Sequence, residues 1–381
     1  MTERVTRSMR NKGKINYLEL LSSFEEEDSL YNSESDEDWE SNSDFSSKTT
    51  NPLIKELEEY TKTINKSFKE DLLEKPWNIK TKAFAFSKIK LIENLDKNSS
   101  DYYKQSEYIN NLFKIPFGEY KPFSIKNMEP HVFLKWAHEE LNNIIYGHQK
   151  CKKRIIEIIA QWIVKKDSVN EPIGFFGPPG IGKTTIIREG FSKILDRPFG
   201  YITLGGASDS SYLDGHSFTY EGSQYGRIID ILIQSKCMNP IIYFDELDKI
   251  SETYKGLEIV HFLTHITDQS QNSLYQDNYF PGINLDLSKC LFIFSFNDET
   301  KVDKILKDRM YVINTKGFNT KEKIEISNNY LLPELLKIFM FDSNDIIFNN
   351  ESIEYIISNY TLKEEGVRNL KIQFNISIIS S

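Results

Sequence analysis

A glycine-rich segment at residues 177–184 constrains this 381-residue chain more than any other feature of its sequence. The segment reads Gly-Pro-Pro-Gly-Ile-Gly-Lys-Thr, which is the G-x-x-x-x-G-K-T pattern of a phosphate-binding loop. Glycines let the backbone curl so that several N–H groups point inward at phosphate oxygens. Lys183 can then reach the β and γ phosphates of a nucleotide, and the Thr184 hydroxyl can bind Mg²⁺.

The residues on either side of this loop favour the same interpretation. Residues 172–176 have the pattern of a short buried strand, and the residues after Thr184 open a helix whose N-terminus adds positive potential at an anion. We therefore predict a P-loop α/β parallel sheet that binds ATP and Mg²⁺. The predicted contacts of the loop with the nucleotide are Gly177, Pro178, Pro179, Gly180, Ile181, Gly182, Lys183, Thr184 and Thr185.

Two further apolar runs end in polar residues that suit nucleotide chemistry. Residues 240–246 read as a central strand that ends in Asp245 and Glu246, and open α/β sheets bind ligands at the carboxyl ends of their strands. We expect Asp245 to hold Mg²⁺ through water and Glu246 to orient or deprotonate the attacking water. Residues 291–297 form a third such run that ends in Asn297. This amide can hold the attacking water, although an asparagine that only ends a strand is equally compatible with the spacing.

Several short motifs follow one another in the order found in one protein family. The motifs are Tyr-Gly-His at 146–148, LGGASD at 204–209, GHSFTYEG at 215–222, DELDKI at 245–250, QNS at 271–273, DLSK at 286–289, DRM at 308–310, YLLP at 330–333 and GVRNL at 366–370. With them, the chain from about residue 146 to residue 369 resembles the ATPase module of the Lon ATP-dependent proteases, a branch of the AAA+ class.

The resemblance implies roles that spacing alone does not assign. Tyr146 and Gly147 would contact the nucleotide, Asn297 would be the first sensor, and Arg368 would be the second sensor, on a helical lid. Arg309 would be an arginine finger that reaches the nucleotide of a neighbouring subunit. A guanidinium suits both arginine roles because it spreads charge over several phosphate oxygens. A finger supplied by a neighbour implies a homo-oligomeric ring, a hexamer in this family.

The resemblance also implies a polypeptide substrate, gripped by Tyr220 on a pore loop. Here the chain departs from the family pattern. Glu221 stands where the family has an apolar residue, and Ser217 and Phe218 replace two basic residues. These changes indicate either a different grip on the substrate or a different substrate.

The composition divides the chain into four predicted parts. Residues 1–50 form an acidic tail, because residues 25–44 contain ten acids and no Lys or Arg, and we expect the tail to be disordered and solvated. The whole chain has 47 basic and 56 acidic residues, so the remainder is near neutral. The other parts are a helical connector at 51–142, with a helix over 51–75, an AAA+ core at 143–315 and an incomplete helical lid at 316–381. Alternating apolar residues predict a strand over 371–381.

The leading hypothesis is an ATPase of the AAA+ class that couples ATP hydrolysis to protein unfolding or remodelling. No segment resembles the serine nucleophile motif of the Lon peptidase domain, so peptidase activity is not expected from these residues. One alternative is the ATPase half of a truncated Lon-type serine protease, with a separate peptidase partner. Another is a non-hydrolysing protein that mixes into rings.

The remaining features bear on the location and partners of the protein. Its three cysteines are scattered and lack metal-binding spacing, which is typical of a reducing intracellular compartment, and we expect a cytoplasmic protein rather than one imported into an organelle. No apolar run approaches eighteen residues, so we predict no membrane span. A nucleic-acid partner is not expected either, because the basic run at 150–154 carries no interleaved aromatic residues.

Overall fold

The computed structural model describes residues 67–165, 171–207, 209–220, 222–342, 345–361 and 363–379. The predicted acidic tail and the first part of the helix predicted at 51–75 lie outside these residues. The described residues belong to the unit Lys66–Ser381. No helix within these ranges combines the length and the apolar character needed to cross a membrane.

The centre of this unit is a parallel sheet with the strand order β2-β3-β4-β1-β5. Every neighbouring pair of strands is parallel, and the β3–β4 register places Phe244 opposite Phe294. The strands are β1 (Ile173–Phe176), β2 (Phe199–Thr203), β3 (Ile241–Asp245), β4 (Leu291–Phe296) and β5 (Tyr311–Asn314). The three strands predicted from buried apolar runs are confirmed as β1, β3 and β4.

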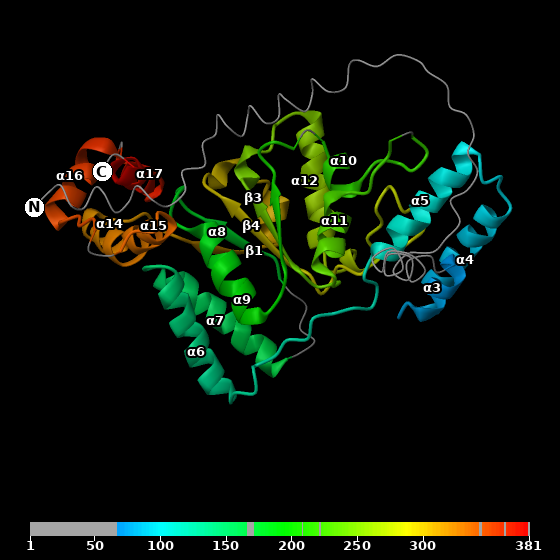
Figure 1. The fold of residues 1–381 in the computed structure, drawn as a ribbon, viewed down its shortest axis with the longest axis horizontal. Coiled ribbons are helices and arrows are strands. Elements are labelled where there is room, and N and C mark those ends of the chain that lie inside the picture. Colours follow the sequence, from blue (N-terminus) through cyan, green and yellow to red (C-terminus); the bar gives the residue numbers. More distant parts are fainter. Residues whose placement is uncertain are drawn as a thin grey trace, which may run out of the picture. The chain divides into compact units, whose positions relative to one another are not determined.

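Alternate residues of the central strands face opposite layers of helices, as the two-residue period of a strand requires. Ile241, Tyr243 and Ile293 point into a core shared with α6 (Pro130–Ile144), α7 (Gln149–Val164) and α9 (Ser192–Leu195). Phe244 and Phe294 point into a second core shared with α11 (Arg227–Ser235) and α12 (Tyr254–Thr267). Figure 1 shows the sheet between these two helical layers. The sheet is therefore buried on both faces, as expected for a parallel sheet.

Short elements complete this α/β layer structure. They are α8 (Lys183–Thr185), which continues through a π-helical turn (Ile186–Phe191) into α9, then α10 (Ser211–Asp214), α13 (Lys304–Asp308) and three 3₁₀ turns at Leu247–Lys249, Asn272–Leu274 and Glu299–Lys301.

Among the residues described from 67 onward, three helices precede the α/β layers: α3 (Phe68–Glu74), α4 (Ile79–Glu93) and α5 (Ser100–Lys114). Ser67 caps α3 in a capping box with Glu70, which satisfies two backbone donors at the start of that helix. The domain boundary predicted at residue 142 falls inside α6, whose buried Phe133, Ala137 and Leu141 belong to the same core as the sheet. The predicted domain limits, this one included, stay predictions.

A helical lid follows β5 and has its own apolar core. Its elements are α14 (Thr320–Ile326), a π-helical turn (Ser327–Leu331), α15 (Leu332–Ile338), α16 (Asn350–Tyr360) and α17 (Arg368–Ile379). The strand predicted over 371–381 is wrong, because residues 371–379 belong to α17. Leu370, Phe374 and Ile378 are buried at a spacing of four, and this helical spacing competes with the alternation that favoured a strand. The predicted α/β fold with a helical lid is confirmed.

Candidate active site

The phosphate-loop motif joins the carboxyl end of β1 to α8, where a helix N-terminus and a strand end meet. Gly180 and Gly182 have φ angles of 75° and 89°, a region that side chains rarely tolerate. Space is also limiting, because a Cβ on Gly182 would lie 2.4 Å from the Cδ1 of Ile145. The glycines of the motif therefore serve both the turn and its close packing.

The Lys183 side chain lies back along the loop. Its Nζ donates to the carbonyl oxygen of Gly177 at 2.5 Å, to the Oδ1 of Asn297 at 2.5 Å and to the carbonyl oxygen of Phe296 at 3.3 Å. Burial lowers the Lys183 pKa to about 8, although Asp245 acts against this shift. The ammonium is thus held by neutral oxygens that phosphate oxygens would outcompete.

Asp245 ends β3 and accepts several hydrogen bonds. Its carboxylate accepts from the Tyr201 hydroxyl at 2.9 Å, from the Glu246 backbone N–H at 3.0 Å and from the Ser295 hydroxyl. Tyr243 lies between Asp245 and the loop, because its hydroxyl is 3.5 Å from the Asp245 Oδ1 and 3.2 Å from the Thr184 Oγ1. These bonds hold the carboxylate in place, and the Tyr243 hydroxyl links it to the hydroxyl of Thr184.

The oxygens of Thr184 and Asp245 suit Mg²⁺. This ion prefers oxygen ligands, keeps several waters, and is commonly held by one or two carboxylates together with substrate phosphates. One carboxylate and one hydroxyl, bridged by the Tyr243 hydroxyl, form such a donor set. Burial also raises the Tyr243 pKa, so this phenol stays protonated and can orient both partners.

Glu246 follows Asp245 with a φ angle of 60°, in the left-handed region that is costly for a side-chain-bearing residue. Its carboxylate lies against Gly205, where an added Cβ would come within 2.4 Å of the Oε2 of Glu246. The LGG motif therefore leaves room for this carboxylate. Strained backbone of this kind is concentrated at functional sites.

A cavity of about 390 Å³ separates the phosphate loop from the helical lid. The predicted residues that line it are Tyr146, Pro179, Gly180, Ile181, Gly182, Lys183, Thr184, Thr185, Asp245, Glu246, Asn297 and Arg368. The lid also bonds to the loop directly, since the backbone N–H of Val367 donates to the Gly180 carbonyl oxygen at 3.0 Å. Arg368 follows Val367, so this contact places the arginine at the loop.

Part of the cavity lining is apolar and aromatic. Ile145, Phe318 and Leu331 belong to this lining, and the hydroxyl of Tyr146, which also lines the cavity, donates to the Glu325 carboxylate at 3.3 Å. His148 lies next to this lining, with its Nε2 3.0 Å from the Ile181 carbonyl oxygen and its ring 5.0 Å from that of Phe318. Flat apolar walls with a few polar atoms suit a nucleobase.

Several lining residues were not predicted from the sequence: Ile144, Ile145, Phe318, Ile326, Tyr330, Leu331, Glu334, Val367 and Lys371. Most of them belong to the lid and reach the cavity only through tertiary packing. Of these, the family-like YLLP and GVRNL motifs include Tyr330, Leu331 and Val367, which is the one sequence signal that points to them.

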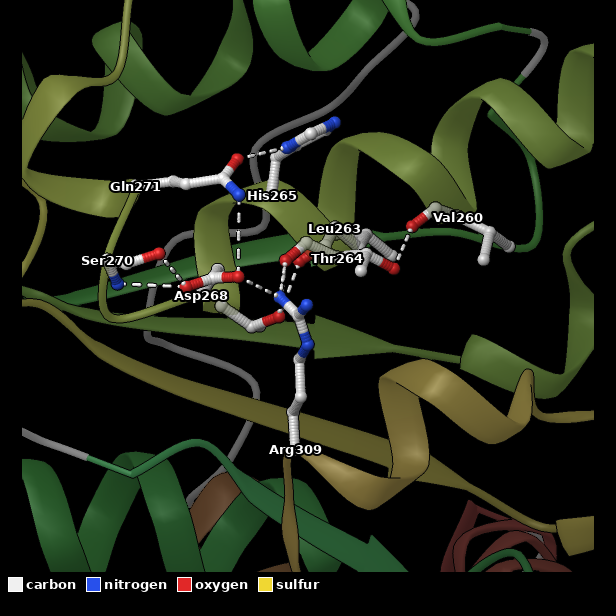
Figure 2. A network of polar contacts seen from close by, with 9 residues as sticks. Val260, Leu263, Thr264, His265, Asp268, Ser270, Gln271 and Arg309 are labelled. Atoms are coloured by element: carbon white, nitrogen blue, oxygen red, sulfur yellow. Dashed lines mark hydrogen bonds and ion pairs between the residues drawn. The ribbon is translucent and has the colours of Figure 1, made fainter.

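Five predicted residues do not line this cavity: Gly147, Gly177, Pro178, Arg309 and Tyr220. Gly177 and Pro178 offer their carbonyl oxygens to the Nζ of Lys183, at 2.5 Å and 3.4 Å, and Gly147 packs near Phe318. Arg309 lies elsewhere: its Nη1 donates to the Thr264 carbonyl oxygen at 2.6 Å and pairs with Asp268 at 3.1 Å (Figure 2).

Tyr220, the predicted pore residue, is 69% exposed and also lies outside the cavity-lining set. The structure therefore collects the predicted phosphate loop, acids and two sensors around one cavity. It leaves Arg309 and Tyr220 in other surroundings.

Comparison with known proteins places this site in context. Residues 173–317 match the family of ATPases associated with various cellular activities (AAA). The chain is 39% identical over 283 residues to a Lon protease homolog of Acanthamoeba polyphaga mimivirus, which covers 72% of this chain and 28% of that protein. It is 37% identical over 285 residues to the Lon protease of Porphyromonas gingivalis, covering 75% of this chain and 32% of the relative.

A third relative has a similar sequence identity and coverage. The Lon protease of Campylobacter jejuni is 36% identical over 290 residues, covering 74% of this chain and 35% of that protein. The chain thus spans about a third of the length of the curated relatives it matches.

Proposed function

Because the chain carries a Lon-like AAA+ ATPase module, we propose that it hydrolyses ATP and uses the energy to unfold or remodel proteins. The observation that carries this proposal is the convergence of Lys183, Asp245, Glu246, Asn297 and Arg368 on one cavity. A single cation at a phosphate loop is common in anion sites. Two acids, an amide and a second cation around the same cavity are what hydrolysis of a terminal phosphate requires.

Catalysis by these residues would consist of positioning and charge stabilisation. Lys183 exchanges its carbonyl partners for the β and γ phosphate oxygens. Glu246 orients the attacking water and accepts its proton, and Asn297 holds that water on the opposite side. Arg368 binds phosphate oxygens from the lid and draws the lid towards the loop.

Mg²⁺ fits the donor set described above. Thr184 would hold it directly, and Asp245 would hold it through water. When bound, the ion neutralises part of the charge on the β and γ phosphates. Tyr201, Tyr243 and Ser295 keep Asp245 oriented for this contact.

Arg309 is proposed to act in a neighbouring subunit. Among the residues that the structure describes, its hydrogen bond to Thr264 and its ion pair with Asp268 both use Nη1. The side chain is 31% exposed, so guanidinium hydrogens remain for a phosphate. Arg309 belongs to the DRM motif but does not line the nucleotide cavity of its own subunit. This position is compatible with a role in the next subunit of a homo-oligomeric ring, which is a hexamer by resemblance to Lon. Each subunit would then complete the site of the next.

The proposed substrate is an unfolded polypeptide. Tyr220 supports this proposal because it is a large aromatic side chain that is 69% exposed in a motif similar to the Lon pore loop. An exposed aromatic residue can press against many different side chains without sequence preference.

Phosphate release by the purified full chain, with and without Mg²⁺, tests the ATPase proposal. Glu246→Gln should retain ATP and lose turnover, because the amide keeps the shape but does not accept the proton of the attacking water. Glu252→Gln is a matched control, because this exposed glutamate lies six residues further on and does not line the cavity. Absence of phosphate release from the wild-type protein would favour the non-hydrolysing ring protein instead.

A second candidate is the ATPase half of a Lon-type serine protease that works with a peptidase partner. The names of the relatives favour it. ATP-dependent degradation of an unfolded protein would require that partner. Adding the partner to the purified ATPase and measuring peptide release tests this candidate.

A further inference from the structure

Phe218, which replaces a basic residue of the Lon-like pattern, packs into an aromatic slot formed by Tyr108, Tyr279 and the Lys104 side chain. Its ring meets the ring of Tyr108 on α5 at 4.8 Å and that of Tyr279 at 5.5 Å, both edge to face. Lys104, also on α5, places its Nζ 5.1 Å from the centre of the same ring. Edge-to-face pairs and a cation over a ring are favourable geometries. The slot therefore explains why an aromatic residue occupies this position.

The backbone next to Phe218 is held by the same helix. The Nζ of Lys104 donates to the Thr219 carbonyl oxygen at 3.0 Å. This bond and the slot fix two consecutive residues that directly precede Tyr220. The side chain of Tyr220 itself is 69% exposed, so the anchor holds the backbone and leaves the ring free for contact.

The two ends of the segment from Gly215 to Gly226 are fixed separately, by residues 277 and 278. The side-chain amide of Asn278 donates to the Gly215 carbonyl oxygen at 3.2 Å, and the Gly226 N–H donates to the Asp277 carboxylate at 2.9 Å. The base of the segment thus has hydrogen bonds that do not come from α5. Between Gly215 and Tyr220, α5 contacts the segment at Phe218 and Thr219.

We propose that Phe218 and Lys104 are positioning residues that tie Tyr220 to α5, so that the N-terminal helices and the substrate-contacting residue move together. This inference rests on the proposed role of Tyr220. A tyrosine on a tethered backbone binds a polypeptide with a smaller loss of conformational freedom. The tether also passes the pull of a bound polypeptide to α5.

The experiment compares the full-length Phe218→Ala, Lys104→Ala and Phe218→Tyr variants with wild type. Lys114→Ala is the matched control, since it removes a lysine of the same helix that donates to Asn111 and not to the segment. Casein serves as the unfolded polypeptide. The measurements are phosphate release without casein, the casein concentration for half-maximal stimulation, and amide hydrogen exchange of residues 216–220.

We expect Phe218→Ala and Lys104→Ala to raise the casein concentration for half-maximal stimulation by about fivefold or more, with unchanged phosphate release in its absence. Amide exchange at residues 216–220 should quicken by at least about tenfold in Phe218→Ala. Phe218→Tyr should restore both readouts, because it keeps the ring. Lys114→Ala should match wild type.

The inference is overturned if both alanine variants show the wild-type casein concentration for half-maximal stimulation and the wild-type amide exchange rates at residues 216–220. If the wild-type protein releases phosphate but casein does not stimulate this release, the unfoldase proposal fails. The amide exchange rates of residues 216–220 in the variants then test on their own whether Phe218 and Lys104 tether this segment to α5. If the wild-type protein releases no phosphate, the ATPase proposal fails instead. Lys104→Ala, a change on the helix surface, decides the question if Phe218→Ala does not fold.

Discussion

Arg309 closes the C-terminal end of α12 by bonding to Thr264 and pairing with Asp268 at 3.1 Å. A helix ends with carbonyl oxygens that lack partners, and a cation there satisfies them. Asp268 is itself oriented by the Ser270 hydroxyl at 2.6 Å and by the Gln271 side-chain amide at 3.5 Å, as Figure 2 shows. Hydrogen bonds from the Ser270 hydroxyl and backbone N–H, together with the charge of Arg309, lower the pKa of Asp268. The guanidinium is therefore aimed by a carboxylate that stays ionised.

Arg309→Lys should lower the kcat for ATP by about 10³-fold without weakening ATP binding, because a point charge does not replace the planar fork of an arginine finger. Asp268→Asn should lower the kcat by about tenfold, since it misplaces the finger without removing it. Both are measured by steady-state phosphate release. Lys307→Ala is the control, because it breaks a nearby ion pair with Glu299 and leaves Arg309 in place. An unchanged kcat in Arg309→Lys would contradict the finger role.

Gly205→Ala should lower the kcat by about 10²-fold while ATP binding persists. The added methyl group would lie 2.4 Å from the Oε2 of Glu246, and the flexible carboxylate can move away more easily than the backbone. A misplaced general base then slows water attack. Gly206→Ala is the matched control, because a Cβ there meets nothing within 4 Å. An equal kcat for Gly205→Ala and Gly206→Ala would show that catalysis does not require the Glu246 carboxylate to lie against Gly205.

The sheet and its catalytic edge were predictable because each depends on a short stretch of sequence. β1, β3 and β4 are apolar runs of four to six residues, and their parallel pairing brings Asp245 and the phosphate loop to one edge. Burial of both sheet faces leaves little freedom in how such runs pack. The predicted strands and their polar ends therefore hold without knowledge of the rest of the chain.

The lid was less predictable because its fold and its share of the cavity depend on contacts distant in sequence. Residues 370–379 carry apolar residues at spacings of both two and four, and only packing against the other lid helices selects the helix that buries Phe374. Phe318 and Glu334 reach the cavity through that packing. The contacts of Arg309 likewise depend on the position of α12, because its hydrogen-bond partner Thr264 lies 45 residues earlier in the chain.

ATP affinity should fall as pH rises above about 8 because of Lys183. Burial lowers the Lys183 pKa from 10.5 to about 8, so the free protein loses this charge near that pH, whereas bound phosphates favour the charged form. The dissociation constant should then rise by up to about tenfold for each pH unit. Equilibrium dialysis at pH 7, 8, 9 and 9.5 measures it. Lys183→Arg, which keeps its charge, should show a flat profile, and a flat wild-type profile would contradict the lowered pKa.

Asp277 should make the folded protein less stable as pH rises from about 4 to about 7. Burial raises its pKa from 3.8 to about 7, with its neighbour Asp214 adding to the shift, so the folded state holds this proton more tightly than the unfolded state does. The resulting stabilisation is present below pH 4 and lost as pH approaches 7. It amounts to at most about 4 kcal/mol.

Asp277→Asn should remove this dependence, because an amide does not titrate. Its single oxygen can accept from only one of the backbone N–H groups of Gly226 and Tyr279 that Asp277 now binds, so the variant loses some stability equally at every pH. Urea unfolding of wild type and variant at pH 4, 5, 6 and 7 measures the difference. Asp298→Asn is the control of opposite sign, since the Thr300 hydroxyl lowers the pKa of Asp298 and its stabilisation is lost as pH falls. Parallel profiles for wild type and Asp277→Asn would mean that Asp277 is ionised in the folded protein throughout this range.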